Sequence, residues 1–171
     1  MTSSVELTST VTPDLYRAVF RRYAAGVVVI TADAGFGPAG FTATSLASIS
    51  LEPPLVSFAL STSASSWPTI ARAETLVVNF LDAEQHAIAA RFATSGIDRF
   101  AAPTRWSRLA TGEPILVDVP GHLRGRVLQR HETGDHHLVV AEVLDASTRH
   151  HAPLLYHAGS YTTVATTAPW H

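Results

Sequence analysis

The sequence contains no cysteine in its 171 residues. This absence excludes disulfide scaffolds, thiolate nucleophiles, iron–sulfur clusters and zinc sites that use cysteine. The nine histidines supply no replacement motif, because neither H-x-H nor H-E-x-x-H occurs. If the pairs His136–His137 and His150–His151 lie on strands, their members point to opposite faces, so each pair offers one ligand to a given site. We therefore expect no metal site.

Charged residues are scarce as well. They make up 15% of the chain against 46% hydrophobic residues, with a net charge of −2. A chain this apolar is expected to have surface that a second copy covers, so we predict a homo-oligomer. The basic residues are scattered along the sequence, which gives no electrostatic basis for binding nucleic acid.

Long apolar runs and a secretion signal are also missing. No uninterrupted apolar stretch approaches the roughly 20 residues of a membrane-spanning helix. The opening residues, MTSSVELTSTVTPD, have neither a basic nor an apolar region of the kind found in signal peptides. We expect a cytoplasmic protein that does not bind membranes. The length fits one domain over residues 1–171, with loose tails at 1–11 and 166–171.

Small neutral hydroxyls are abundant in the segment GFTATSLASISLEPPLVSF, residues 40–58. On a strand over residues 42–50, alternation places Thr42, Thr44, Ser48 and Ser50 on one face and apolar side chains on the other. Hydroxyls and backbone N–H groups hold a phosphate or a heteroaromatic edge without adding charge. This strand is a candidate for binding a flat polar ligand, and a solvated edge strand is the alternative.

The predicted elements favour a mainly β fold. Strands follow one another in the chain instead of alternating with helices, which is typical of an antiparallel barrel with peripheral helices. The predicted strands are 27–31, 42–50, 55–60, 76–81, 122–130, 136–146 and 161–164. The predicted helices run from Pro13, after an N-cap at Thr12, to Gly26, from about 67 to 73, and from a capping box at Asp82 and Gln85 to about 93.

A glycine motif follows the first predicted strand. Gly35, Gly37 and Gly40 match the G-x-G-x-x-G pattern of dinucleotide-binding domains. That motif requires a helix that begins within the glycines. Here Pro38 lies inside the motif, and the residues that follow favour a strand. We interpret the glycines as a hairpin turn that brings residues 27–31 against 42–50.

Four segments, taken in order, resemble the flavin reductase family of flavin-binding split barrels. These small NAD(P)H:flavin oxidoreductases serve two-component monooxygenases. The segments are GVVVIT at 26–31, the hydroxyl segment at 40–58, TGDHHLVVAEV at 133–143 and PLLYHAGSY at 153–161. The resemblance spans about residues 15–164. The sequence departs from the family at Arg124-Gly125, where relatives usually carry Glu-Cys, and at Ala141, where they commonly carry glycine.

The resemblance implies a six-stranded antiparallel Greek-key split barrel that forms a homodimer with flavin at the interface. The resemblance also implies a set of cofactor-binding residues, and the hydroxyl face described above adds Ser48 to it. His136 is in addition the catalytic candidate, on the nicotinamide side of the flavin. The set is Thr42, Thr44, Ser45, Ser48, Ser61, Ser65, Ser66, Phe92, Asp135 and His136. Outside these motifs, we interpret Arg99 as a solvated charge at the end of a helix, with a phosphate anchor as the alternative.

The implied activity is hydride transfer from NADH or NADPH to FMN, with FAD as the alternative acceptor. Reduced flavin would then pass to a monooxygenase component. Such chemistry needs stacked coenzymes and no protein nucleophile, which agrees with the lack of a G-x-S-x-G motif. Two alternatives remain: a flavin-retaining protein of the same fold that acts as a redox tailoring enzyme or binding module, and a barrel that binds a different ligand.

Overall fold

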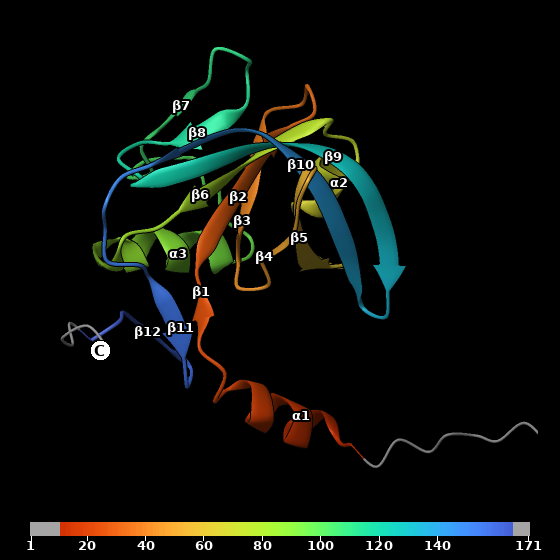
Figure 1. Cartoon of the computed structure of the whole chain (residues 1–171), viewed down its shortest axis with the longest axis vertical. Coiled ribbons are helices and arrows are strands. Elements are labelled where there is room, and N and C mark those ends of the chain that lie inside the picture. The colour runs from red at the N-terminus through yellow and green to blue at the C-terminus, as the bar shows by residue number, and fades with distance from the viewer. Residues whose placement is uncertain (1–10, 166–171) are drawn as a thin grey trace, which may run out of the picture.

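A computed structural model describes residues 11–165, and a seven-stranded antiparallel sheet dominates it (Figure 1). The strand order is β3-β2-β6-β9-β10-β5-β4. The mainly β class with peripheral helices is confirmed, and the predicted count of six strands is corrected to seven in this sheet. The predicted tails lie outside the described residues, apart from Val11. The strands are β2 (Val28–Asp33), β3 (Pro38–Ala43), β4 (Ala47–Leu51), β5 (Pro54–Ser61), β6 (Thr75–Phe80), β9 (Gly121–Thr133) and β10 (His136–Thr148).

Strands β3 and β4 lie at opposite ends of the sheet, yet only residues 44–46 separate them in sequence. The two ends of the sheet must therefore come close together, and the sheet curls into an open barrel. The predicted continuous strand 42–50 is therefore wrong. At the crossing, the Ser45 hydroxyl accepts a hydrogen bond from the Ala59 N–H at 2.9 Å and donates one to the Ala59 carbonyl at 3.1 Å. A side chain thus takes the place of a ladder partner, and the alternation of faces expected for 42–50 does not continue past Thr44.

Strand β2 is buried on both faces, as its run of apolar residues predicts. Val28 and Ile30 belong to the cluster inside the barrel, whereas Val29 packs in a second cluster with α3 (His86–Ala93). Gly40 of β3 allows this close packing. A Cβ atom there would lie 2.8 Å from the Ile30 carbonyl oxygen and 2.9 Å from the Phe92 ring.

The glycine motif forms the predicted hairpin turn, since β2 and β3 pair directly as antiparallel neighbours. Asp33 Oδ1 accepts hydrogen bonds from the N–H groups of Gly35 at 2.8 Å and Gly37 at 3.2 Å. Both glycines have positive φ angles, 91° and 104°, which other residues rarely adopt. The motif is therefore a hairpin turn and lacks the helix that a dinucleotide-binding motif requires.

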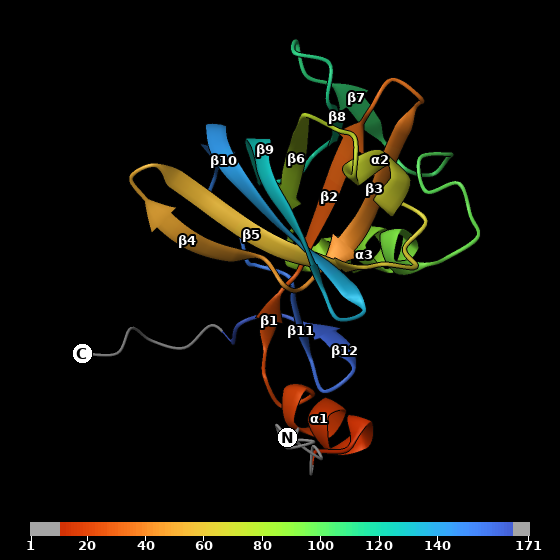
Figure 2. The same ribbon diagram turned by 90° about the vertical axis from the view of Figure 1, so that its right-hand side faces the viewer.

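The first helix, α1 (Pro13–Phe20), begins as predicted, with the Thr12 hydroxyl accepting from the Leu15 N–H at 3.2 Å. It ends before the predicted Gly26, because Ala25–Gly26 form β1, which pairs with β11 (Leu155–His157). Figures 1 and 2 show α1 standing away from the barrel, below β1, β11 and β12 (Ser160–Thr162).

The remaining elements are short. The predicted capping box at Asp82 and Gln85 is confirmed at the start of η1 (Ala83–Gln85), which leads into α3. The sequence did not predict the small sheet of β7 (Trp106–Arg108) and β8 (Pro114–Leu116). Helix α2 (Trp67–Ile70) follows the serine-rich segment at residues 61–66 and is shorter than the predicted helix at about 67–73. None of the helices within residues 11–165 has the length and apolar character needed to cross a membrane.

A buried carboxylate ties β9 to the loop before β8. Glu113 is only 4% exposed, and its oxygens accept hydrogen bonds from the Arg124 guanidinium at 2.7 Å and from the Thr111 hydroxyl. Burial alone would raise the pKa of Glu113, but hydrogen bonds from Thr111, Thr75 and Arg124 outweigh it and lower the pKa to about 2. The charged form of Glu113 therefore stabilises the folded state.

We expect this stabilisation to be fully present above about pH 4.5 and to be lost as the pH falls through the window between 4.5 and about 2. Its size is on the order of 3 kcal/mol. The Glu113→Gln variant should be less stable at neutral pH, because Arg124 loses its partner, and its stability should fall less steeply on acidification. Urea unfolding at a series of pH values measures this, with exposed Glu132→Gln as the control. Parallel curves for Glu113→Gln and the parent protein would show that Glu113 does not carry the acid sensitivity.

Candidate functional site

A cleft of about 470 Å³ opens at the split in the barrel, where β3, β5, α3 and the loop after β5 meet. On β5, Phe58 and Leu60 are buried in the barrel core, so the alternating residues Ala59 and Ser61 face outward and line the cleft. The crossing from β3 to β4 supplies the opposite wall. The cleft is thus a consequence of how the barrel closes, and its volume falls within the range of small-molecule sites.

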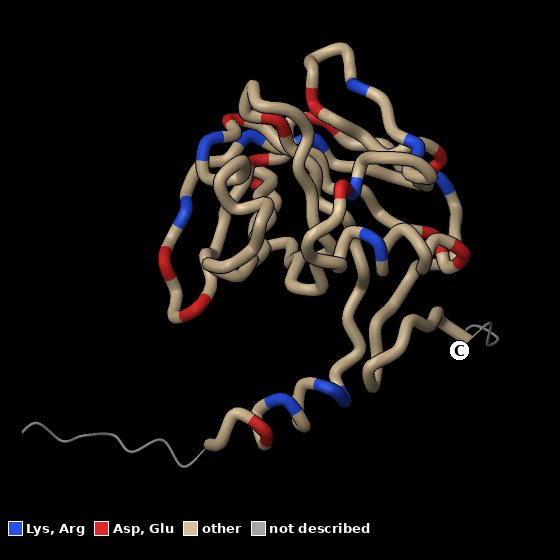
Figure 3. Tube along the Cα trace, turned by 180° about the vertical axis from the view of Figure 1, so that it is seen from behind, with Lys and Arg blue, Asp and Glu red and all other residues tan. Residues whose placement is uncertain are grey.

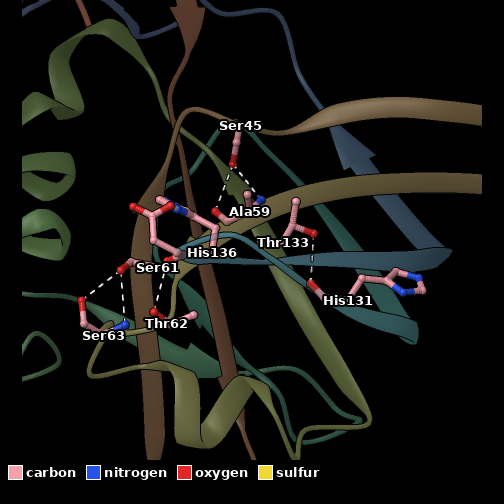
Figure 4. A network of polar contacts seen from close by, with 9 residues as sticks. Ser45, Ala59, Ser61, Thr62, Ser63, His131, Thr133 and His136 are labelled. Carbon is pink, nitrogen blue, oxygen red and sulfur yellow. Dashed lines mark hydrogen bonds and ion pairs between the residues drawn. The ribbon is translucent and has the colours of Figure 1, made fainter. Parts of the chain in front are cut away.

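Most of the predicted cofactor-binding residues lie together in this cleft. Those that line it are Thr42, Thr44, Ser45, Ser61, Ser65, Phe92 and His136. Two of the hydroxyls also hold the walls in place. The Thr42 hydroxyl donates to the Ala89 carbonyl of α3 at 2.6 Å, and Ser45 bonds the Ala59 backbone as described above (Figure 4). The Ser61 and Ser63 hydroxyls bond each other at 2.9 Å on the loop after β5.

The structure places three predicted residues outside the cleft. Ser48 lies exposed on β4, beyond the crossing that the sequence did not reveal. Ser66 is buried, and its hydroxyl donates to the Gly40 carbonyl at 2.8 Å. Asp135 directs its carboxylate to His136 instead of the cleft. These three residues therefore do not line the cleft, and their part in cofactor binding stays a prediction.

Arg99, which we interpreted from the sequence as a solvated charge, lies in the wall of the cleft. Arg99 lines the cleft and is partly buried, and burial lowers its pKa from the ordinary value. Its Nε donates to the Thr94 carbonyl at 3.0 Å, and its Nη1 donates to the Gly40 carbonyl at 2.8 Å and to Ser66 Oγ at 3.0 Å. Within residues 11–165, Nη2 has no hydrogen-bond partner. The guanidinium is therefore fixed in place with one nitrogen free.

This cation is a local feature. Arg99 is the one permanently charged side chain among the described residues that line the cleft. Elsewhere, residues of both signs are spread over the trace (Figure 3). The residue arrangement in IDRF, residues 97–100, does not reveal this location, because the burial of Arg99 depends on the Gly40 carbonyl and on Ser66, which are distant in sequence.

His136 lies at the rim of the cleft, at the start of β10, and pairs in register with Ser61 of β5. Its Nδ1 lies 2.7 Å from Asp135 Oδ1. The hydrogen bond and the charge of His136 lower the pKa of Asp135. His137 points to the opposite face, as the sequence predicts, and its ring stacks on Trp67 with 3.5 Å between ring centroids. Only one histidine of the pair serves the cleft.

The lining therefore suits an elongated ligand with three parts. Neutral hydroxyls and exposed backbone can bind a flat heteroaromatic edge and a hydroxylated chain. The free Nη2 of Arg99 can bind a phosphate. His136 can hydrogen-bond a second molecule that enters over the rim.

Comparison with known proteins gives matches over nearly the whole described chain. The model of the flavin reductase like domain matches residues 20–165. NADH:FMN oxidoreductase of Rhodococcus erythropolis is 47% identical over 91% of this chain and 84% of its own. The HsaB reductase subunit of a flavin-dependent monooxygenase from Rhodococcus jostii is 35% identical over 92% of this chain and 83% of its own.

A solved structure shares the fold. NADH:FAD oxidoreductase SgcE6 of Streptomyces globisporus, determined with NAD and FAD fragments, superposes with a TM-score of 0.86 at 30% identity. The superposition covers 94% of this chain and 99% of that one. The range matched by the domain model includes every residue that lines the cleft.

Proposed function

Because this chain belongs to the flavin reductase-like family, we propose that it is an NADH:FMN oxidoreductase that supplies reduced flavin to a monooxygenase component. The predicted resemblance is confirmed by the match over residues 20–165. Relatives named NADH:FMN oxidoreductase and monooxygenase reductase subunit support the donor, the acceptor and the recipient. The observation on this chain that best supports the proposal is the neutral cleft at the barrel split, with the single fixed cation of Arg99 in its wall.

The lining residues fit a flavin mononucleotide. Thr44 and the backbone of residues 44–45 would hold the ring edge, the loop hydroxyls of Ser61 and Ser65 would hold the ribityl chain, and Arg99 would bind the phosphate. Bound flavin supplies the ring that accepts a hydride, so the protein needs no nucleophile. His136 would hydrogen-bond the nicotinamide as it enters over the rim. FAD is the alternative acceptor and NADPH the alternative donor, and the activity assay described below includes both.

We also propose a homodimer. None of the residues of α1, which is described in full, is buried. Tyr16, Phe20 and Tyr23 gather on one side of the N-terminal segment, each more than half exposed. A short helix with an apolar face in water has little stability of its own, so a second copy is the expected cover. A cavity of about 570 Å³ between α1, β11 and the turn after β11 shares Thr44 and Ser45 with the cleft, so this interface would border the flavin.

Light scattering tests the dimer, and a mass near twice 18.3 kDa is expected. A mass of 18.3 kDa at all concentrations would exclude it.

The activity is tested by mixing the purified protein with NADH and FMN without oxygen. One FMN should be reduced for each NADH consumed, and dialysed protein should lose its yellow colour and regain activity with added FMN. Inactivity with NADH and NADPH across FMN, FAD and riboflavin would reject the reductase. Colour that survives dialysis, with slow NADH consumption, would favour the flavin-retaining alternative.

A further inference from the structure

We propose that Asp135 is a positioning residue that holds His136 in one orientation and one tautomer at the rim of the cleft. This inference rests on the proposed function, because it concerns how His136 meets the nicotinamide substrate. Asp135 does not line the cleft itself. It acts through two different groups, its carboxylate and its backbone carbonyl.

The carboxylate determines which ring nitrogen is free. Oδ1 of Asp135 lies 2.7 Å from Nδ1 of His136, and the Asp135 side chain is 94% exposed, so it is ionised at neutral pH. An ionised carboxylate only accepts hydrogen bonds, and Nδ1 must therefore carry the hydrogen. In the neutral imidazole, Nε2 then remains as an acceptor for a molecule in the cleft. Without Asp135, the ring would be free to exchange tautomers.

The carbonyl of Asp135 fixes the turn to the loop after β5. It accepts hydrogen bonds from the Thr62 N–H at 3.0 Å and from the Thr62 hydroxyl at 3.2 Å. Thr62 lies between Ser61 and Ser63, both of which line the cleft (Figure 4). The register pair of His136 with Ser61 adds a further link between the two elements. The turn that carries His136 and the loop that carries the cleft hydroxyls are thus joined as one unit.

These contacts matter because His136 would otherwise be mobile. Its side chain is 47% exposed, and exposed side chains exchange rotamers freely. An exposed ion pair adds little to the stability of the folded protein, so the effect of the Asp135–His136 pair is expected in NADH binding. If the Asp135 carboxylate only solvates the turn, its removal should not change NADH binding. If it positions His136, its removal should weaken NADH binding.

The test compares Asp135→Ala, Asp135→Asn, His136→Ala and the double variant Asp135→Ala/His136→Ala. We expect Asp135→Ala to raise the KM for NADH about fivefold, the effect of losing one exposed charge-assisted hydrogen bond, with kcat and the KM for FMN little changed. Asparagine can accept from Nδ1–H or donate to a bare Nδ1, so Asp135→Asn keeps a partner for the ring without fixing the tautomer and should fall between the parent and Asp135→Ala. In the His136→Ala background, Asp135→Ala should have no further effect. Glu132→Ala removes a carboxylate from the same hairpin without touching His136 and should be neutral.

Nitrogen-15 chemical shifts of the His136 ring give a readout that does not depend on activity. The parent protein should show the tautomer protonated at Nδ1, and Asp135→Ala should show a mixture. The proposal is overturned if the tautomer is the same in both, or if Asp135→Ala raises the KM equally in the His136→Ala background. A parent protein that does not reduce flavin at all would reject the proposed function, while the nuclear magnetic resonance result would still decide the role of Asp135.

Discussion

Replacing Ala59 with tryptophan is expected to abolish flavin reduction while leaving the barrel folded. Ala59 lines the cleft from β5, on the face opposite the buried Phe58 and Leu60. An indole at this position would project into the cleft and occupy space assigned to the flavin. We expect FMN affinity to fall by about 100-fold or more, equivalent to roughly 3 kcal/mol. The hydrogen bonds of Ala59 to Ser45 involve only its backbone, so they remain available to the variant.

Fluorescence quenching of FMN measures the affinity, and the NADH-dependent rate measures the activity. Ser57→Trp is the matched control, because Ser57 lies two residues earlier on the same face of β5 and does not line the cleft. It should bind FMN normally. Circular dichroism checks that both variants are folded. A folded Ala59→Trp protein with normal FMN affinity would show that the flavin binds elsewhere.

Replacing Arg99 with methionine is expected to weaken FMN binding far more than riboflavin binding. The free Nη2 of Arg99 is the charged donor assigned to the phosphate, and riboflavin has no phosphate. Hydrogen bonds to charged groups contribute about 1.5–3 kcal/mol, so the dissociation constant for FMN should rise about 10- to 150-fold. Riboflavin affinity should change by less than about threefold, since methionine preserves the apolar stem but not the charge.

The riboflavin measurement also controls for structural damage, because Arg99 bonds the Gly40 carbonyl and Ser66. Equal losses for FMN and riboflavin would mean that Arg99 supports only the shape of the cleft. Arg72→Met provides a protein control: Arg72 is exposed, lies outside the cleft and contacts Phe36. It should bind both flavins like the parent protein.

The sequence was sufficient where local interactions decide the structure. The apolar run at residues 27–31 predicts a strand buried on both faces, and β2 is one. Thr12 caps its helix, and Asp82 with Gln85 forms its capping box, because each motif involves only neighbouring residues. The glycine turn is in the same class, since Asp33 bonds residues only two and four positions away.

Tertiary interactions decided what the sequence could not predict. No glycine, proline or charged residue interrupts residues 42–50, and nothing local indicates that the chain crosses from one edge of the sheet to the other at Ser45. For that reason strand alternation predicts Ser48 on the face of Thr42 and Thr44, whereas in the structure Ser48 lies on a separate strand, β4. Short strands such as β1 exist only through pairing with a distant segment, and Gly26 was mistaken for a helix stop.

The candidate site shows the same division. Thr42, Thr44, Ser45, Ser61, Ser65 and His136, which the family motifs indicate by their spacing, lie in the cleft, whereas Ser48 and Ser66 do not. Arg99 has no such motif, and its position depends on a backbone carbonyl 59 residues away in sequence. The orientation of Asp135 away from the cleft likewise follows from the hairpin turn rather than from its place in the motif.

A crystal structure of the protein with FMN would show whether the cleft is the flavin site. We expect the isoalloxazine ring in the cleft between Ser45 and the loop after β5, with the phosphate bonded to Arg99 and the rim beside His136 open to the nicotinamide. Flavin bound at another surface, or a cleft closed by its own side chains in the presence of saturating FMN, would contradict this expectation.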